Sequence, residues 1–342
     1  MQSQSLFTSR RTWLIVISVI VVGALAFAVY RRRGSPPSPP ENRKITIAQA
    51  GDFFLYAPLY IAKDAGIFAN KGLDVDLIST GGDDKTWAAI ISGSASFGVA
   101  DPTFVAISDK RGQPGRVIAS VVNGVPFWGI TFKPNITTTT DAKQLAKYRV
   151  ATFPAPSTAF TLQKDMFQRA GVQGNIREGA FGTLMAMLKS DQADIALELE
   201  PNVSQAVAEG AHVIYAMSDV YGDFAITGLT ASPELLARDP KLAEDVVCAL
   251  QQALDFARKQ PDATLGILAK RFPEIKPQVA QAALTRAINS GIIPRETTIG
   301  QTAWDKAIDV RVKVGDLSAP KTMDAYVDNT FAKHAVTSCR SN

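Results

Sequence analysis

Residues 45–80 read ITIAQAGDFFLYAPLYIAKDAGIFANKGLDVDLIST, and this stretch decides the fold class. Alternating isoleucines predict a short strand at its start, which stops at the Ala-Gly-Asp turn of residues 50–52. Residues 57–65 have helical spacing with a proline in the first turn, and residues 73–77 alternate between apolar and acidic side chains, as a second strand does. Because a helix connects the two strands, we expect them to lie parallel in one sheet.

The loop after the first strand carries one acidic and three aromatic side chains, Asp52, Phe53, Phe54 and Tyr56. In a parallel α/β unit, the loop that leaves the carboxyl end of a strand is the usual position of a ligand. We therefore expect these residues to face a ligand and the rings to stack on a planar one. Packing of the rings in the core is the alternative interpretation.

The composition is that of a globular protein with room for about two domains of roughly 150 residues each. The chain has 342 residues, of which 46% are hydrophobic and 20% charged, and its formal net charge is +4. Five arginines precede residue 34, whereas no acidic residue precedes Glu41, so the rest of the chain is nearly neutral. This balance disfavours binding to nucleic acid.

The two cysteines, Cys248 and Cys339, belong to no Cys-x-x-Cys motif or Cys/His cluster, so neither a metal nor another cofactor is expected. A disulfide between them is allowed if the protein is exported. However, Cys248 lies in an apolar helical pattern and Cys339 lies close to the last residue. These positions favour a buried thiol and a separate thiol in the tail.

The uncharged run of residues 13–30 predicts an N-terminal transmembrane helix, because 18 helical residues span about 27 Å. Residues 1–12 would then be cytoplasmic, and the proline-rich residues 31–43 would form an extended linker. The alternative is a signal peptide that is cleaved near Ala28. The basic residues on both flanks leave the orientation open.

The remainder of the chain repeats the α/β pattern twice and then becomes helical. Strand and helix patterns alternate to residue 126, which by repetition predicts a parallel α/β domain, and begin again at residue 127, which predicts a second α/β domain. Residues 224–230 form an apolar strand pattern that can return to the first domain. Amphipathic helices are then expected at residues 240–259, 262–271, 276–290, 302–314 and 323–333.

Four motifs resemble those of the solute-binding proteins of ABC transporters, in the SsuA/THI5-like branch for nitrate, sulfonates, taurine and thiamine-pyrimidine precursors. They read APLYIAKDAGIFANKGLDVDL at residues 57–77, SGSASFGVADP at 92–102, APST at 155–158 and QADIALELEP at 192–201. The likeness covers residues 44–333. It implies a type II periplasmic-binding-protein fold, in which two α/β lobes joined by two crossover strands close on a ligand by hinge motion.

The resemblance also implies lobe boundaries, partners and a location. Lobe 1 would comprise residues 44–126 and 231–336, and lobe 2 would comprise residues 127–230. Both would lie on the periplasmic face of the cytoplasmic membrane and deliver a small-molecule solute to ABC permease and ATPase subunits. The family is mostly secreted or lipid-anchored and this chain has no lipobox cysteine, so anchoring in the membrane by residues 13–30 departs from the family pattern.

Carried over to this chain, the resemblance places the candidate ligand-binding residues in loops at strand ends. They are Asp52, Phe53, Phe54, Tyr56, Gly82, Asp83 and Asp101 in lobe 1, and Ser157, Thr158, Phe160, Glu198 and Glu200 in lobe 2.

Two groups of candidates in lobe 2 suggest complementary chemistry. Ser157 and Thr158 precede a predicted helix, where hydroxyls and backbone N–H groups suit a ligand oxygen, although helix capping alone explains them equally well. Glu198 and Glu200 lie two residues apart on one strand and suit an amino group or a protonated nitrogen, with a solvated strand end as the alternative. Acids near aromatic rings favour a pyrimidine or another aromatic or nitrogenous solute over a sulfonate or nitrate.

Two other functions fit less well. A thiamine-pyrimidine synthase resembles this fold but requires a cysteine-rich motif and an active-site histidine, whereas His212 and His334 are the only histidines here. We therefore expect no enzymatic activity. A membrane-anchored ligand sensor would have to signal through another protein, because the predicted cytoplasmic segment is short.

Overall fold

The computed structural model describes residues 42–109 and 115–340. The chain divides after Asn42, and Arg43–Asn342 form one compact unit, to which the following description applies. The predicted transmembrane helix at residues 13–30 lies outside the described residues. Within the described ranges, none of the helices combines the length and the apolar character that crossing a bilayer requires.

The first of two five-stranded sheets contains the strand pair that the opening stretch predicts. β1 pairs in parallel with β2, with Ile45 opposite Val75, and α2 (Ala57–Asp64) connects them, so the predicted strand–helix–strand unit is confirmed. In the order β2-β1-β3-β10-β4, the strands are β2 (Leu73–Ser79), β1 (Arg43–Gln49), β3 (Phe97–Ala100), β10 (Ala225–Ala231) and β4 (Arg116–Asn123).

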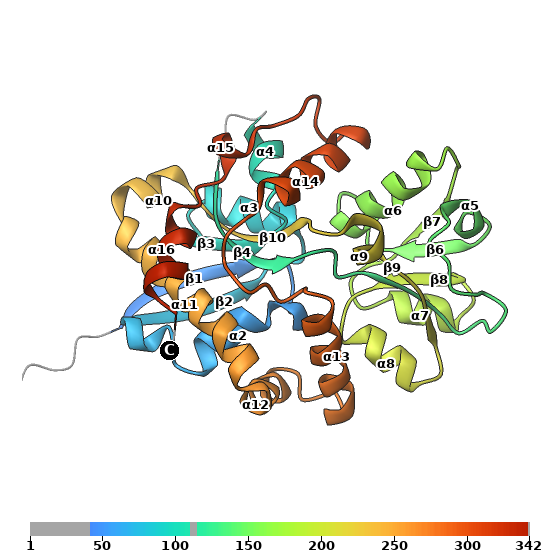
Figure 1. Ribbon diagram of the computed structural model, residues 1–342, viewed down its shortest axis with the longest axis horizontal. Helices are drawn as coiled ribbons and strands as arrows, with labels where there is room; N and C mark the ends of the chain where they lie inside the picture. The colour runs from blue at the N-terminus through green and yellow to red at the C-terminus, as the bar shows by residue number, and fades with distance from the viewer. Residues whose placement is uncertain (1–41, 110–114, 341–342) are drawn as a thin grey trace, which may run out of the picture. The chain divides into compact units, whose positions relative to one another are not determined.

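The second sheet has the same plan. Its β6 pairs in parallel with both β7 and β8, and its β5 lies between β8 and β9 (Figure 1). In the order β7-β6-β8-β5-β9, the strands are β7 (Asn175–Glu178), β6 (Arg149–Thr152), β8 (Ile195–Glu198), β5 (Trp128–Thr131) and β9 (His212–Ala216).

The expectation of a parallel first domain is wrong, because among the described residues each of the two sheets contains one antiparallel strand. β10 runs antiparallel to β3 and β4, and β5 runs antiparallel to β8 and β9. β5 is the first strand after the chain leaves the first sheet, and β10 is the strand by which it returns. Each therefore starts at the side of its sheet where the neighbouring strands end. The carboxyl ends of the other eight strands therefore meet between the two sheets, which is where ligands bind in open α/β structures.

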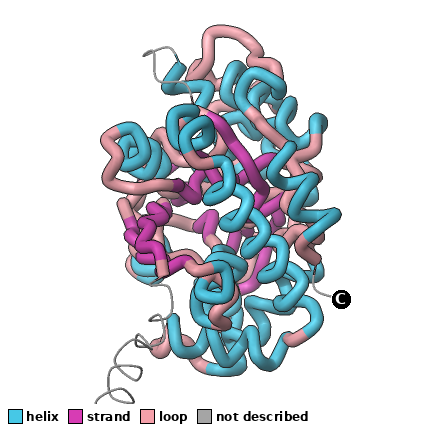
Figure 2. The backbone as a smooth tube through the Cα atoms, turned by 90° about the vertical axis from the view of Figure 1, so that its left-hand side faces the viewer, coloured by secondary structure: helices cyan, strands magenta, loops and turns pink. Residues whose placement is uncertain are grey.

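Helices surround the strands of both sheets (Figure 2). Those that precede β10 are short, apart from α6. Besides α2, they are η1 (Phe54–Tyr56), η2 (Ala69–Lys71), α3 (Asp83–Ile91), α4 (Phe104–Asp109), α5 (Ala142–Leu145), α6 (Thr158–Arg169), α7 (Leu184–Lys189), α8 (Asn202–Ala208) and α9 (Met217–Tyr221).

The helical C-terminal region is confirmed, with one difference. The last predicted helix is divided in two, because Val327 leaves the helical path and bridges to Val117 of β4. The helices are α10 (Pro233–Arg238), α11 (Pro240–Lys259), α12 (Pro261–Arg271), α13 (Pro277–Asn289), α14 (Gln301–Lys313), α15 (Met323–Tyr326) and α16 (Thr330–Ser338).

The expectation of two separate thiols is also wrong, because Cys248 and Cys339 form a disulfide across 91 residues. Helix α16 packs against α11 and brings the two Cα atoms to 5.4 Å, a tertiary contact that sequence spacing does not reveal. His334 lies beside the two sulfurs. Neither sulfur is available as a thiolate ligand while the disulfide is formed.

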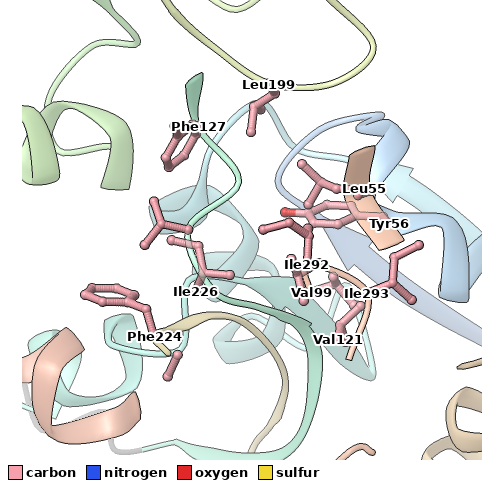
Figure 3. Packing of buried hydrophobic residues seen from close by; sticks show 14 of the residues in the cluster. Leu55, Tyr56, Val99, Val121, Phe127, Leu199, Phe224, Ile226, Ile292 and Ile293 are labelled. Carbon is pink, nitrogen blue, oxygen red and sulfur yellow. The ribbon is translucent and has the colours of Figure 1, made fainter. Parts of the chain in front are cut away.

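The buried apolar side chains form a continuous cluster that extends from the first sheet to the second. Leu55 and Tyr56, from the loop after β1, belong to it together with Val99 of β3 and Phe127 at the start of β5 (Figure 3). Tyr56 is 3% exposed, and burial raises the pKa of its hydroxyl well above the ordinary value. Part of the predicted ligand-binding loop therefore also serves as core.

Candidate ligand-binding cleft

A cavity of about 620 Å³ lies where the strand ends of the two sheets face one another. The first sheet contributes the loops at residues 50–54 and 79–81, and the second contributes residues 198–202 together with Phe153 and Phe181. The loop between α12 and α13 adds further lining residues, Phe272, Glu274 and Ile275.

A smaller cavity of about 50 Å³ adjoins the first, since the two share the lining residues Ala50, Phe53, Phe153, Phe181 and Leu199. Side chains from both sheets also line this inner cavity. They include Tyr56 and Asp83 from the first sheet's loops and Ser157 and Thr158 from the start of α6. The two cavities together form one cleft, with an outer and an inner part.

Aromatic rings from the two sheets meet where the outer and inner parts join. The ring centroids of Phe53 and Phe181 lie 5.2 Å apart, and those of Phe181 and Phe153 lie 4.4 Å apart. Phe181 is 36% exposed, whereas Phe153 is 3% exposed. Phe53 and Phe181 both line the cleft, and aromatic rings in such a position can stack on a planar ligand.

Three of the five acidic candidates are paired with arginines. Asp52 pairs with Arg271 of α12, while a carboxylate oxygen of Glu200 lies 2.5 Å from Nε of Arg286 of α13. The third pair is buried: an Nη of Arg311 of α14 lies 2.8 Å from Asp101, and both side chains are 2% exposed.

Glu198 is the buried acid of the cleft that has no cationic partner among the described residues. Its Oε2 accepts hydrogen bonds from the backbone N–H of Leu199 (3.1 Å) and from Nδ2 of Asn202 (3.2 Å), whereas its Oε1 accepts none from the part of the chain that the structure describes. The side chain is fully buried, and desolvation raises the pKa of its carboxyl group to about 7. The solvated strand end considered from the sequence therefore does not describe this residue.

Asp83, at the first turn of α3, is the other predicted acid for which the described residues offer no arginine at hydrogen-bond distance. One of its carboxylate oxygens accepts the backbone N–H of Asp101 (3.0 Å). Desolvation, followed by the negative charge of Asp101, raises its pKa to about 6. The inner and outer parts of the cleft thus each contain a carboxyl group whose pKa is raised by desolvation.

Nine of the twelve predicted residues line the cleft, and Gly82, Asp101 and Phe160 do not. The carbonyl of Gly82 is used by the first turn of α3, and Asp101 is held by Arg311. The capping alternative also holds for Ser157, whose Oγ accepts the N–H of Phe160 (3.3 Å) while the residue lines the inner cavity. Assignment of the nine residues to ligand binding remains a prediction.

Sequence reasoning missed several lining residues. Phe153 and Phe181 follow the ends of β6 and β7, so the rule that strand-end loops face the ligand, applied more widely, would have found both. Asn202 and Gln205 lie on α8, directly after the predicted glutamates. No local pattern identifies Phe272 and Glu274, because only tertiary packing brings the loop between α12 and α13 to the cleft.

Two mixed α/β sheets with strand ends that converge on a cleft define the architecture of the periplasmic-binding proteins, and solved structures support this at the level of the fold. The ligand-binding component of an ABC-type import system from Staphylococcus aureus matches with a TM-score of 0.70 at 14% identity, covering 86% of this chain and 99% of that one. The periplasmic nitrate-binding protein NrtA from Synechocystis PCC 6803 has a TM-score of 0.67 at 18% identity, covering 88% and 90%.

The chain belongs to the NMT1/THI5-like family, whose model matches residues 54–264, more than half of the sequence. The resemblance inferred from the four motifs is therefore confirmed. Among curated proteins, the riboflavin-binding protein RibY of Chloroflexus aurantiacus is 21% identical over 320 residues, which cover 87% of this chain and 88% of that protein.

Proposed function

We propose that this protein is the extracytoplasmic solute-binding component of an ABC importer and that it captures a small organic solute in the cleft. The observation that carries the proposal is the cleft itself, which loops from both sheets line at the ends of their strands. Its outer cavity of about 620 Å³ is within the range of small-molecule sites.

The proposal includes a type II fold with two lobes that close by hinge motion. The chain passes from the first sheet to the second through residues 124–127 and returns through residues 217–224, so these segments are the proposed hinges. Because β10 belongs to the first sheet, we place the return to lobe 1 near residue 225 and not at residue 231.

The disulfide supports a location outside the cytoplasm, since such bonds persist in oxidising compartments. We propose that the unit lies on the periplasmic face of the cytoplasmic membrane, with residues 13–30 as an anchor or as a signal that is cleaved near Ala28. Its partners there would be the permease and ATPase subunits of the importer.

Binding without catalysis fits the cleft better than a synthase-like reaction does. Neither histidine lies in its lining as far as the structure describes it: Nε2 of His212 is 2.8 Å from the carbonyl oxygen of Ile136, and His334 lies beside the disulfide. The relatives reported above are named for binding riboflavin, an aromatic molecule, and nitrate, a small anion. Similarity to them therefore does not by itself indicate the class of solute.

The proposal is tested by native mass spectrometry of the full-length protein purified from its host, followed by calorimetric titration with the solute that is released. We expect one small organic molecule per chain and a more compact form by small-angle X-ray scattering when it is bound. Protein that carries no solute, and that neither binds nor closes on any member of a solute library, would contradict the proposal.

A matched pair of variants locates the site. Phe181→Ala removes an exposed ring from the cleft and should weaken binding of the released solute about tenfold. Ile91→Ala removes a comparably exposed apolar side chain, 40% exposed, from a surface outside the cleft and should leave binding unchanged.

A further inference from the structure

The charges around the cleft indicate the chemical class of the solute, an inference that rests on the proposed function. We infer that the cleft binds a planar nitrogen heterocycle that is neutral or positively charged and that donates an N–H to Oε1 of Glu198. Sulfonates, nitrate and other small anions are excluded.

The first argument is the absence of positive charge from the lining. Among the described residues that line the two cavities there is no lysine, arginine or histidine, whereas Asp52, Asp83, Glu198, Glu200 and Glu274 are all present. An anion that leaves water for this cleft would lose its hydration and meet carboxylates instead of a counter-ion.

The second argument is that the nearby arginines are already paired with acids. Arg271 is bound to Asp52, and Arg286 to Glu200. The third, Arg311, is 1% exposed and held between Asp101 and Asp316. An anionic solute could recruit one of these cations only by leaving a buried or half-buried carboxylate without its partner, which is costly.

The N-termini of α3 and α6, which lie at the cleft, do not provide an anion site either. The first turn of α3 contains Asp83 and Asp84, so acidic side chains of the chain itself already occupy the positive end of the helix. At α6, Oγ of Ser157 accepts the N–H of Phe160, and the hydroxyl of Thr158 bonds to Asp101. An anion placed there would face the carboxylate of Asp101.

Glu198 indicates which group the solute should carry. Its Oε2 has two donors, which fix the plane of the carboxyl group, while its Oε1 is buried and has no partner among the described residues. A buried acceptor without a donor is unfavourable, and because Glu198 lines the outer cavity, a ligand N–H that reaches Oε1 as the proposed lobes close would satisfy it. Because Phe53 and Phe181 line the same cleft, the donor is best carried on the edge of a flat ring that stacks on them.

The inference is tested by isothermal titration of the full-length protein, purified in detergent and freed of bound solute, with two sets of probes. Cytosine, riboflavin and thiamine represent neutral and cationic nitrogen heterocycles, and taurine, ethanesulfonate and nitrate represent anions and sulfonates. We expect at least one heterocycle to bind and no anion to bind at millimolar concentration. The molecule that copurifies with the protein, identified by mass spectrometry, is expected to belong to the first class.

Glu198→Gln tests the named contact while preserving the shape of the side chain. For the heterocycle that binds best, we expect a loss of affinity of about 10- to 100-fold. The two donors to Oε2 hold the carbonyl oxygen of the glutamine in that position, so its NH2 group, a donor, would face the ligand N–H. The matched control is Glu209→Gln at the end of α8, where the glutamate pairs with Lys189 outside the cleft lining, and here affinity should change less than twofold.

The outcomes separate this inference from the proposed function. Binding of a sulfonate or nitrate, or an anionic copurified solute, overturns the inference but leaves a solute-binding protein. Binding of a heterocycle that Glu198→Gln does not weaken overturns the role of Glu198. If no probe binds and no solute copurifies, both the inference and the proposed function fail.

Discussion

At the scale of the residue, Glu198 shows how burial changes the chemistry of a common side chain. It ends β8 opposite Trp128 of β5, and its burial leaves the carboxyl group with hydrogen bonds to one oxygen only. Desolvation favours the neutral form and raises its pKa from 4.5 to about 7. The sequence indicates an acid at a strand end, but not that this acid is half protonated near neutral pH.

This pKa predicts how stability depends on pH. Between pH 4.5 and about 7, the unfolded chain has released the proton of Glu198 whereas the native chain still holds it, so raising the pH through this window lowers the free energy of unfolding. The full effect is about 3 kcal/mol. Glu198→Gln should therefore equal the wild type at pH 4.5 and exceed it by up to about 3 kcal/mol at pH 8.

Urea unfolding of both proteins across this pH range measures the effect as a difference. The difference is needed because the raised pKa of Asp83 acts in the same direction in both proteins. Parallel stability curves for the wild type and Glu198→Gln would show that the carboxyl group titrates normally in the native state.

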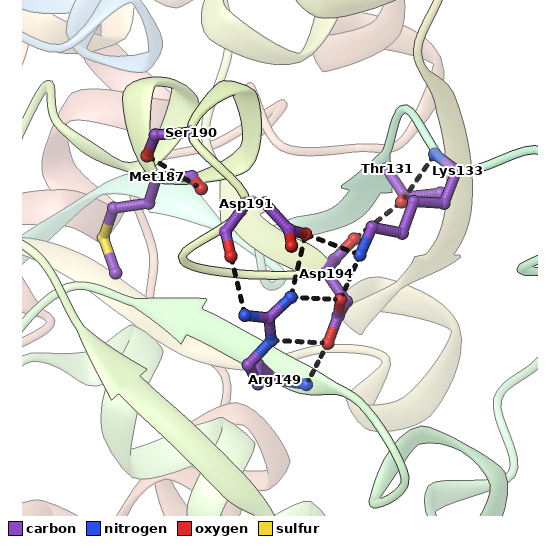
Figure 4. A network of polar contacts seen from close by, with 7 residues as sticks. All are labelled: Thr131, Lys133, Arg149, Met187, Ser190, Asp191 and Asp194. Atoms are coloured by element: carbon purple, nitrogen blue, oxygen red, sulfur yellow. Dashed lines mark hydrogen bonds and ion pairs between the residues drawn. The ribbon is translucent and has the colours of Figure 1, made fainter.

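At the scale of the element, a cluster of charged residues fixes the strand starts of the second sheet. Asp194, just before β8, accepts hydrogen bonds from the backbone N–H and the guanidinium of Arg149 at the start of β6 and from Lys133 after β5 (Figure 4). These contacts lower the pKa of Asp194, chiefly through the hydrogen bond from Arg149. The cluster lies at the strand starts, opposite the edge that faces the cleft.

Asp194→Asn should therefore destabilise the protein without altering the cleft. We expect a loss of about 1 to 3 kcal/mol in the free energy of unfolding at pH 7, because the charge-assisted bonds disappear. In the wild type, the same stabilisation is present above the ordinary pKa of aspartate and is lost as the pH falls below about 4. The control, Asp309→Asn, breaks an exposed pair with Lys313 and should cost less than about 0.5 kcal/mol.

Chemical denaturation measures the expected loss of stability, and solute titration measures whether binding in the cleft is unchanged. An Asp194→Asn protein that is as stable as the wild type would mean that the cluster is solvated and contributes little. Weaker solute binding at unchanged stability would place Asp194 in a role that its position does not explain.

At the scale of the whole molecule, Arg311 connects the proposed lobes. It lies on α14, which packs against both β10 and α6. Its guanidinium bonds to Asp101 after β3 at 2.8 Å and to Oγ1 of Thr161 on α6 at 2.8 Å. A C-terminal helix thus supplies a buried cation that holds elements of both sheets together.

Arg311→Ala should lower the free energy of unfolding by about 3 to 5 kcal/mol, because Asp101 is then buried without its counter-ion. The exposed arginine of the pair Arg340 and Glu296 is the control, and Arg340→Ala should cost less than about 1 kcal/mol. Thermal and urea unfolding measure both variants. Equal and small losses would mean that water replaces the guanidinium beside Asp101.

The local patterns of the sequence predicted most of the fold, because they depend on neighbouring residues. The strand–helix–strand unit of residues 45–80 and the C-terminal helices follow from side-chain spacing, and the family follows from four motifs. Nine of the predicted cleft residues lie at strand ends, where the chain's own order places them. The local patterns did not predict that β5 and β10 run antiparallel to their neighbours, because this depends on how the two sheets face one another.

The sequence by itself determined the α/β class, the family and several of the strand-end loops that line the cleft. Only the tertiary structure decided that Asp52, Asp101 and Glu200 have arginine partners, that Glu198 has none among the described residues, and that the cysteines are joined. The physical reason is separation along the chain. Each arginine lies on a C-terminal helix, many residues after the acid with which it pairs. Charge at the cleft therefore depends on packing between remote segments, whereas the position of the cleft depends on local strand ends.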